Sequence, residues 1–361
     1  MSRNKRWILP LILGGLVSVL FFVWALRGVK WNKVMQSWAQ IQWGWACLAA
    51  AAYLVGMWLR GLRCAWILRP YRTISSWHGT QLVLIGYAAN NILPARLGEL
   101  VRSYALTRRE KVDYGISLST LLMERILDGL AIVGILWFAG SFISKRAWID
   151  EIGWVAGSIF VGAMIVVLLA RLGAGFYKRL LAWGTGLLPG GLGSKVESFG
   201  LRLFDGTHCL QWDRRLPGIL GMSVLIWLVE GSMFAIMLKA FGWPMSWLAA
   251  YLAMSITNLG VLVPSSPGHL GTFHAFCSKV LVVVGVVATK SDALGYAAAV
   301  HLFQLVPVTL LGLWAMNRYG LSLSSIWKLK DEEPPSSEEN GSGESSKLDD
   351  VGRNKTATAT P

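Results

Sequence analysis

The sequence predicts an all-α polytopic membrane protein. Of its 361 residues, 54% are hydrophobic and only 15% are charged, and its mean hydropathy is +0.49. Repeated apolar runs are long enough to cross a bilayer, which soluble folds do not tolerate. We expect about 7–9 hydrophobic segments, two of them broken or re-entrant, in two weakly repeated halves.

The expected segments follow from hydropathy alone. They lie at about 8–26, 43–62, 80–93, 116–140, 152–170, 217–240, 247–263, 271–288 and 293–317. The first is read as a retained transmembrane helix, because no small-residue cleavage site follows it. Segments 80–93 and 247–263 are short or interrupted, and the sequence leaves open whether they span or re-enter.

Charge divides the chain into a basic membrane body and an acidic tail. The net charge is +14, and residues 331–361 hold eight acidic and three basic residues. We expect a transmembrane domain at 1–330, with halves at about 1–170 and 216–320 joined by a basic cytoplasmic segment, 171–215, and then a disordered tail, 331–361. We expect a multi-pass protein of the cell (inner) membrane. Its cytoplasmic side is also expected to hold the connection 60–72, the N-terminus and the tail. Short basic loops favour anionic lipids as partners rather than nucleic acid.

The run at 116–140 carries three charges inside an otherwise apolar helix. Glu124 and Asp128 share a helical face, and Arg125 can pair with Asp128 three residues later. Ionisable groups at membrane depth normally face a protein interior or a watery cavity. Two interpretations stay open: the charges line a polar pathway, or they form an arginine–carboxylate staple that fixes helix packing.

A weak internal repeat, PxxLG, ends each of the two short segments. Half-helix N-termini at such breaks suit phosphates and carboxylates, and paired breaks are typical of transporter sites; ordinary interfacial turns are the alternative. The first copy holds Asn91, Pro94, Arg96, Gly98 and Glu99, and the second holds Asn258, Pro267, Gly268, His269 and Gly271.

Three further polar positions carry separate expectations. Glu230 is a lone acid near the middle of its helix, which favours a cavity-facing role. His301 is expected to contact a neighbouring helix, with Gln304 beside it. Arg102 reads as a loop anchor or as a collector of anionic headgroups at an entrance.

Together these motifs resemble the lysylphosphatidylglycerol synthase transmembrane-region family, whose members are flippase-like. The resemblance covers about residues 8–320. The family's first motif is matched by Asn91, Pro94, Gly98, Glu99 and Arg102, and its intramembrane motif by Glu124, Arg125 and Asp128. The second PxxLG motif departs from the family, because His274 stands where a glutamate is common.

The resemblance implies transbilayer movement of a lipid or lipid-linked carrier with an anionic headgroup. Only the acidic tail follows residue 330, so no synthase activity, cofactor or metal is expected. The alternatives are a membrane-embedded lipid-modifying enzyme and a non-transporting accessory subunit of a lipid or glycan synthesis complex. The expected translocation site comprises Asn91, Pro94, Arg96, Gly98, Glu99, Arg102, Glu124, Arg125, Asp128, Glu230, Pro267, Gly268, His269, Gly271 and His274.

Overall fold

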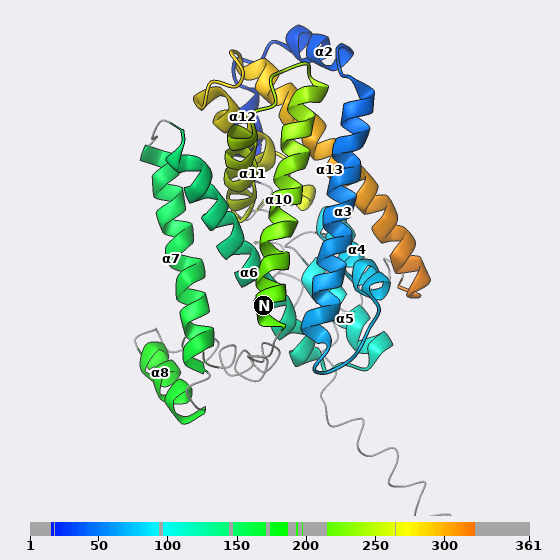
Figure 1. Ribbon diagram of the computed structural model, residues 1–361, viewed down its shortest axis with the longest axis vertical. Coiled ribbons are helices and arrows are strands. Elements are labelled where there is room, and N and C mark those ends of the chain that lie inside the picture. The colour runs from blue at the N-terminus through cyan, green and yellow to red at the C-terminus, as the bar shows by residue number, and fades with distance from the viewer. Residues whose placement is uncertain are drawn as a thin grey trace, which may run out of the picture.

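The fold is a bundle of helices, which confirms the predicted class (Figure 1). A computed structural model of the chain describes residues 16–17, 19–93, 97–143, 147–170, 174–186, 193, 197, 215–263 and 265–321. The predicted disordered tail, Pro94 and Arg96 lie outside these residues. The described helices are α2 (Trp31–Ala39), α3 (Trp43–Leu68), α4 (Ser76–Ile92), α5 (Gly98–Glu110), α6 (Tyr114–Ser141), α7 (Ala147–Ala170), α8 (Ala174–Gly186), α10 (Leu216–Ala240), α11 (Trp247–Val261), the short 3₁₀ helix η3 (Pro267–His269), α12 (Thr272–Val283) and α13 (Lys290–Arg318).

Four of the described helices, α3, α7, α10 and α13, are long and apolar enough to cross a membrane. α6 has 28 residues and is as long as these, but it carries Glu124, Arg125 and Asp128. At 1.5 Å per residue, α6 reaches about 42 Å, which exceeds a hydrocarbon core of about 30 Å. These long helices form the frame of the bundle.

Helices α3 and α10 run antiparallel and define the two ends of the molecule. The backbone N–H of Gln42, before α3, donates to the Ala240 carbonyl at the end of α10 at 2.8 Å. At the opposite end, Gly218 of α10 packs against the Trp66 ring of α3. We call the Gln42–Ala240 side the upper end and the Leu68–Leu216 side the lower end, as they stand in Figure 1.

The two short segments are arms of helical hairpins that enter from opposite ends. Hairpin 1, α4 with α5, starts from the lower end, where α3 stops, and hairpin 2, α11 with α12, starts from the upper end, where α10 stops. α4 has 17 residues and α11 has 15. At about 26 Å and 22 Å, neither arm reaches across a core of about 30 Å. Both are therefore re-entrant, which the sequence had left open.

The tips of the two hairpins meet inside the bundle. η3, in the tip of hairpin 2, packs against α4. Gly268 has a φ of 65°, and a Cβ at this position would lie 3.6 Å from the Asn91 carbonyl oxygen and 3.1 Å from the Leu305 side chain. Glycine tolerates both the left-handed backbone and this close approach. The second PxxLG motif thus lies where the tip of hairpin 2 approaches the end of α4.

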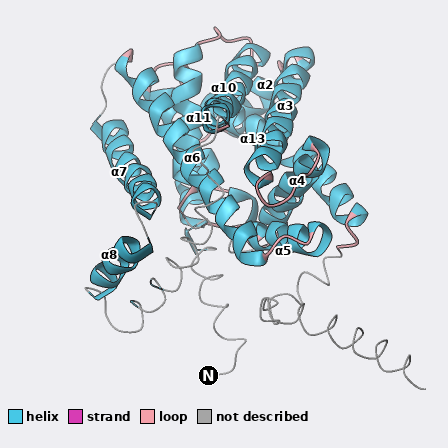
Figure 2. Ribbon diagram, turned by 60° about the horizontal axis from the view of Figure 1, so that its bottom comes forward, coloured by secondary structure: helices cyan, strands magenta, loops and turns pink. Residues whose placement is uncertain are grey.

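Each half contains a long helix, a hairpin and a second long helix. In the first half these are α3, hairpin 1 and α6, and in the second they are α10, hairpin 2 and α13. α7 and α8 stand to one side of this arrangement (Figure 2). The exact domain boundaries stay a prediction.

Two expectations about the first half were wrong. α3 continues to Leu68, so Arg60 and Arg63 lie inside it and are buried rather than in a cytoplasmic connection. The sequence between Trp43 and Leu68 contains no proline and no pair of adjacent glycines that would break a helix. The helix therefore continues past residue 62. Arg102, expected as a loop anchor or as a collector of headgroups at an entrance, is buried on the helix α5.

Candidate functional site

Two arginines one helical turn apart anchor α3 to its neighbours. Arg60 donates from Nη2 to Oε2 of Glu230 on α10 at 2.6 Å. Arg63 donates from Nη1 to Oδ1 of Asp128 on α6 at 2.6 Å and to the Ser223 hydroxyl at 2.9 Å. The Arg60 and Arg63 residues are only 2% and 0% exposed. Buried charges of this kind hold helices together when each has its partner.

A third arginine joins hairpin 1 to α6. Arg102 forms a two-pronged pair with Glu124, with Nη1 and Nη2 donating at 2.9 Å and 2.8 Å. Arg63 Nη2 lies 3.9 Å from the same carboxylate. The planar guanidinium matches a carboxylate in this geometry. Glu124 and Arg102 therefore have a structural role behind the cavity described next.

Arg125 is the least neutralised of these arginines. Its nearest carboxylate oxygen, Oδ2 of Asp128, is 4.0 Å away, and its side chain is 38% exposed. The other oxygen of Asp128 already accepts from Arg63 and from the Trp227 indole N–H at 3.0 Å. The predicted Arg125–Asp128 staple is thus at the limit of ion pairing, and Arg60, Arg63 and Arg102 form the tight pairs instead.

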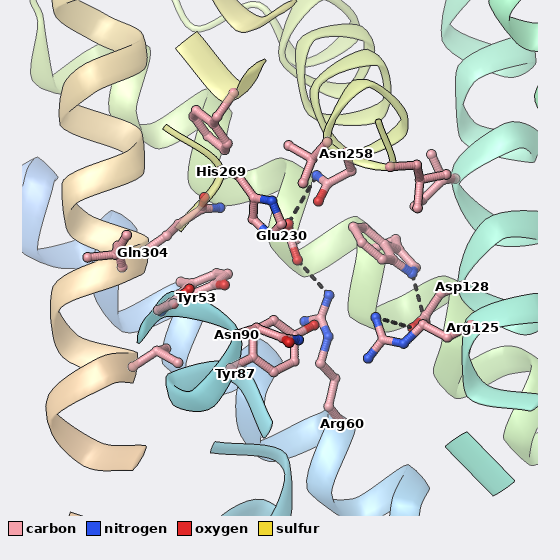
Figure 3. Close-up of a pocket in the computed structure, with 18 of the residues that line it drawn as sticks. Tyr53, Arg60, Tyr87, Asn90, Arg125, Asp128, Glu230, Asn258, His269 and Gln304 are labelled. Carbon is pink, nitrogen blue, oxygen red and sulfur yellow. Dashed lines mark hydrogen bonds and ion pairs between the residues drawn. The ribbon is translucent and has the colours of Figure 1, made fainter. Parts of the chain in front are cut away.

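These charges surround a cavity between the two hairpins (Figure 3). The cavity holds about 200 Å³ of free space. Its lining comes from α3, both hairpins, α6, α7, α10 and α13. The polar and aromatic lining residues are Tyr53, Arg60, Tyr87, Asn90, Asn91, Glu99, Arg125, Asp128, Phe160, Trp227, Glu230, Asn258, His269, Phe273, His301 and Gln304.

The charges in and beside the cavity balance in number among the described residues, with four arginines and four carboxylates, but Arg125 and Glu99 have no tight ion pair. Among the described residues, the four arginines meet three carboxylates, namely Glu124, Asp128 and Glu230. Glu99 also lines the cavity, but it accepts from the Asn90 amide at 3.3 Å and has no arginine within ion-pair distance in the described part of the chain. Of the two arginines that line the cavity, Arg60 has a tight ion pair and Arg125 does not.

Six of the fifteen predicted site residues line the cavity, and several of the other described ones lie beside it. Asn91, Glu99, Arg125, Asp128, Glu230 and His269 line the cavity. Gly98 fits against the Gly86 carbonyl, so it closes hairpin 1, and its N–H donates to Asn90 at 2.8 Å. Pro267, Gly268 and Gly271 form the turn at the tip of hairpin 2.

His274 lies behind the cavity wall. Its ring is 5.0 Å from that of His301, which stacks on Phe273 at 4.5 Å. His301 thus contacts a neighbouring helix, as the sequence led us to expect, and it also lines the cavity. Across the described residues, no group of His, Cys, Asp and Glu side chains is placed to hold a metal ion.

Sequence reasoning missed Arg60 and Arg63 and the aromatic lining residues Tyr53, Tyr87 and Trp227. The signal for the arginines was present, because nothing between residues 43 and 68 breaks a helix. The aromatic residues gave no signal, since tryptophan and tyrosine are common in membrane helices, above all near their ends.

Fold and site together define a polytopic helical membrane protein with a polar cavity between two opposed re-entrant hairpins. The chain belongs to the lysylphosphatidylglycerol synthase TM region family, whose model matches residues 11–312. No solved structure matches it.

Three curated relatives are archaeal. The chain is 25% identical over 316 residues to the glycosyltransferase AglD of Haloferax volcanii, covering 78% of this chain and 50% of that protein. It is 24% identical over 274 residues to a UPF0104 membrane protein of Methanothermobacter thermautotrophicus, with 71% and 78% covered. It is 22% identical over 217 residues to a UPF0104 membrane protein of Methanocaldococcus jannaschii, with 60% and 86% covered. The chain thus spans half the length of AglD and most of the other two.

Proposed function

We propose that this protein moves a lipid or lipid-linked carrier with an anionic headgroup between the two leaflets of a membrane. The observation that carries the proposal is Arg125, which lines a cavity inside the bundle and has no carboxylate oxygen closer than 4.0 Å among the described residues. A phosphate in the cavity would supply the missing partner and gain charge-assisted hydrogen bonds. A charged side chain inside a membrane protein lowers its stability. We therefore explain the presence of Arg125 by its binding to an anionic ligand.

The cavity wall favours a lipid over a free anion. Between α6, α7 and hairpin 2 the lining is apolar, with Gly129, Ile132, Phe160 and Leu262. Leu262 is 48% exposed. Such a wall lets an acyl or prenyl chain stay in the hydrocarbon while the headgroup sits beside Arg125.

The opposed hairpins supply a physical route for alternating access. Hairpin 1 starts from the lower end and hairpin 2 from the upper end, and the cavity lies where their tips meet. Transporters with such paired breaks open a central site to each side in turn by moving one half against the other. Transport rather than catalysis is therefore proposed, with membrane lipids as partners and with lipid- or glycan-synthesis enzymes as the suppliers of substrate.

A leaflet-exchange assay tests the proposal. Proteoliposomes would carry a fluorescent anionic phospholipid or a polyprenyl phosphate, and exchange would be read by quenching the outer leaflet. Arg125→Gln should slow exchange about ten- to a hundredfold, the loss expected for one or two charge-assisted hydrogen bonds. Arg108→Gln is the matched control, because Arg108 is exposed on α5 and does not line the cavity. Equal exchange by wild type, Arg125→Gln and empty liposomes would overturn the proposal.

The name of one relative supports a second candidate, a membrane-embedded enzyme that modifies a lipid. AglD is called a glycosyltransferase, although this chain spans only half of it. Mass spectrometry of the lipids in the same assay separates the two candidates. A transporter returns every lipid unchanged, whereas an enzyme produces a new lipid species even in detergent, where no leaflets exist.

A further inference from the structure

The cavity has two ends with different chemistry. Arg60, Arg125 and Asp128 lie at one end, and Tyr53, Gln304 and His269 lie at the other, with Glu230 and Asn258 between them (Figure 3). The first end is charged. The second is lined by neutral hydrogen-bonding groups and aromatic rings from α3, α13 and hairpin 2.

The neutral end contains polar groups that the protein leaves without hydrogen bonds. Gln304 is 7% exposed and Tyr53 is 6% exposed, and in the described part of the chain neither the Gln304 amide nor the Tyr53 hydroxyl has a hydrogen-bond partner. Both groups line the cavity, so a molecule inside it can provide their partners.

Asn258, between the two ends, adds an acceptor beside the neutral end. Its amide N–H groups donate to Glu230 Oε1 at 3.2 Å and to the Met254 carbonyl at 2.9 Å. These bonds fix the side-chain orientation and leave the amide oxygen uncommitted. The neutral end therefore offers an amide that both donates and accepts, a hydroxyl and a further carbonyl oxygen.

The charges at this end disfavour a cationic headgroup. Glu230 is the nearest carboxylate, and it is already bound by Arg60 at 2.6 Å and by Asn258. An ammonium group placed here would have to break that buried pair, which is costly. A neutral group with several hydroxyls meets no such penalty.

We propose that the neutral end is a sugar subsite, so that the substrate headgroup is a sugar joined through phosphate to a lipid chain. The proposal rests on the transport function above: Arg125 takes the phosphate, and Gln304, Tyr53 and Asn258 take the hydroxyls. Sugar hydroxyls both donate and accept, and the apolar face of a sugar ring packs on aromatic side chains such as Tyr53. A site built to bond a substrate hydroxyl discriminates strongly against an analogue that lacks it.

The size of the cavity limits the headgroup. Its 200 Å³ equals the liquid volume of about seven water molecules. That room accommodates a single sugar ring. The proposed substrate is thus a lipid phosphate that carries a single sugar.

Paired lipids test this inference. Wild type in nanodiscs would be titrated with a polyprenyl phosphate and with the hexosyl phosphate on the same prenyl chain, and binding would be read by native mass spectrometry. The hexosyl lipid should bind at least about tenfold more tightly. Tyr53→Phe and Gln304→Leu should each reduce that preference by about two- to tenfold, one hydrogen bond apiece, and leave binding of the bare phosphate lipid unchanged.

Matched controls and the contrary outcomes complete the test. Tyr104→Phe and Gln81→Leu change the same residue types on hairpin 1, away from the cavity lining, and should keep the full preference. Equal binding of the two lipids by wild type, or tighter binding of lysylphosphatidylglycerol, would overturn the sugar subsite. If Arg125→Gln still weakens binding of the bare phosphate lipid, the transport proposal survives that result; if wild type binds neither lipid, both proposals fall.

Discussion

Single residues set the electrostatics of the bundle. Arg63 is fully buried and contacts Asp128, Ser223 and Glu124, so it joins α3, α6 and α10 at one point. Removing one partner from such a buried group lowers the stability of the protein, because the remaining partners are left as unpaired buried charges. Arg63 is therefore predicted to be structural, and Arg125, with its looser pairing, functional.

Arg63→Met should lower the free energy of unfolding by about 3–5 kcal/mol, because it leaves the buried Asp128 carboxylate without its main cation. The measurement is the thermal midpoint and folded yield in detergent. Arg72→Met is the control: the Arg72 side chain is 56% exposed and lies 3.7 Å from Glu110, so its loss should cost less than about 1 kcal/mol. Equal effects of the two variants would contradict the structural role given to Arg63.

At the scale of elements, glycines decide where helices approach each other. Gly61 of α3 and Gly79 of α4 face each other so closely that a side chain on either would overlap the other helix. Gly129 of α6 is covered by the Phe160 ring of α7 in the same way. Close approach through small residues is the usual means of helix packing in membranes, where apolar side chains gain little over lipid.

Gly129→Ala should push the Phe160 ring away and loosen α7, at a cost of about 1–3 kcal/mol for overpacking. Differential scanning fluorimetry in detergent would measure the shift. Gly134→Ala, on the same helix, is the matched control because nothing lies within 4 Å of its added methyl group. This control should be neutral or stabilising by up to about 1 kcal/mol. If the Gly129→Ala protein proves as stable as the control, the packing role of Phe160 is refuted.

The whole molecule has a more basic lower end, which sets its proposed orientation. At this end Arg69 and Arg72 follow α3, Arg108 and Arg109 are in the last turn of α5, and Lys111 follows it. The helix α8, with Lys178 and Arg179, lies at the same end (Figure 1). Cytoplasmic loops carry such an excess of arginine and lysine. The lower end is therefore proposed to face the cytoplasm of a multi-pass cell-membrane protein.

Thiol labelling of intact cells checks this orientation. In a background without Cys47 and Cys209, a membrane-impermeant maleimide should label Lys33→Cys, near the upper end, and should leave Arg72→Cys unlabelled until the cells are opened. Both side chains are exposed, so accessibility of the protein surface does not differ between them. The reverse labelling pattern would invert the assigned topology.

Much of the fold followed from the sequence because hydropathy and helix breakers are local properties. The long apolar runs, the short pair at 80–93 and 247–263, and the PxxLG tips were all visible without coordinates. The predicted helix ends were less accurate where basic residues were taken as the sign that a helix had ended. α3 runs beyond its predicted end at residue 62, as far as Leu68, because Arg60 and Arg63 find carboxylates on other helices.

The sequence by itself determined the class of protein, the positions of its membrane segments and the presence of intramembrane charges, since each is encoded in a continuous stretch of chain. Only the tertiary structure decided which charges pair. Arg125 and Asp128 are neighbours in sequence, yet Asp128 binds Arg63, 65 residues away, and Glu124 binds Arg102 from hairpin 1. Ion pairs depend on which helices pack together, and that packing brings Tyr53, Asn258 and Gln304 from three separate helices to one end of a single cavity.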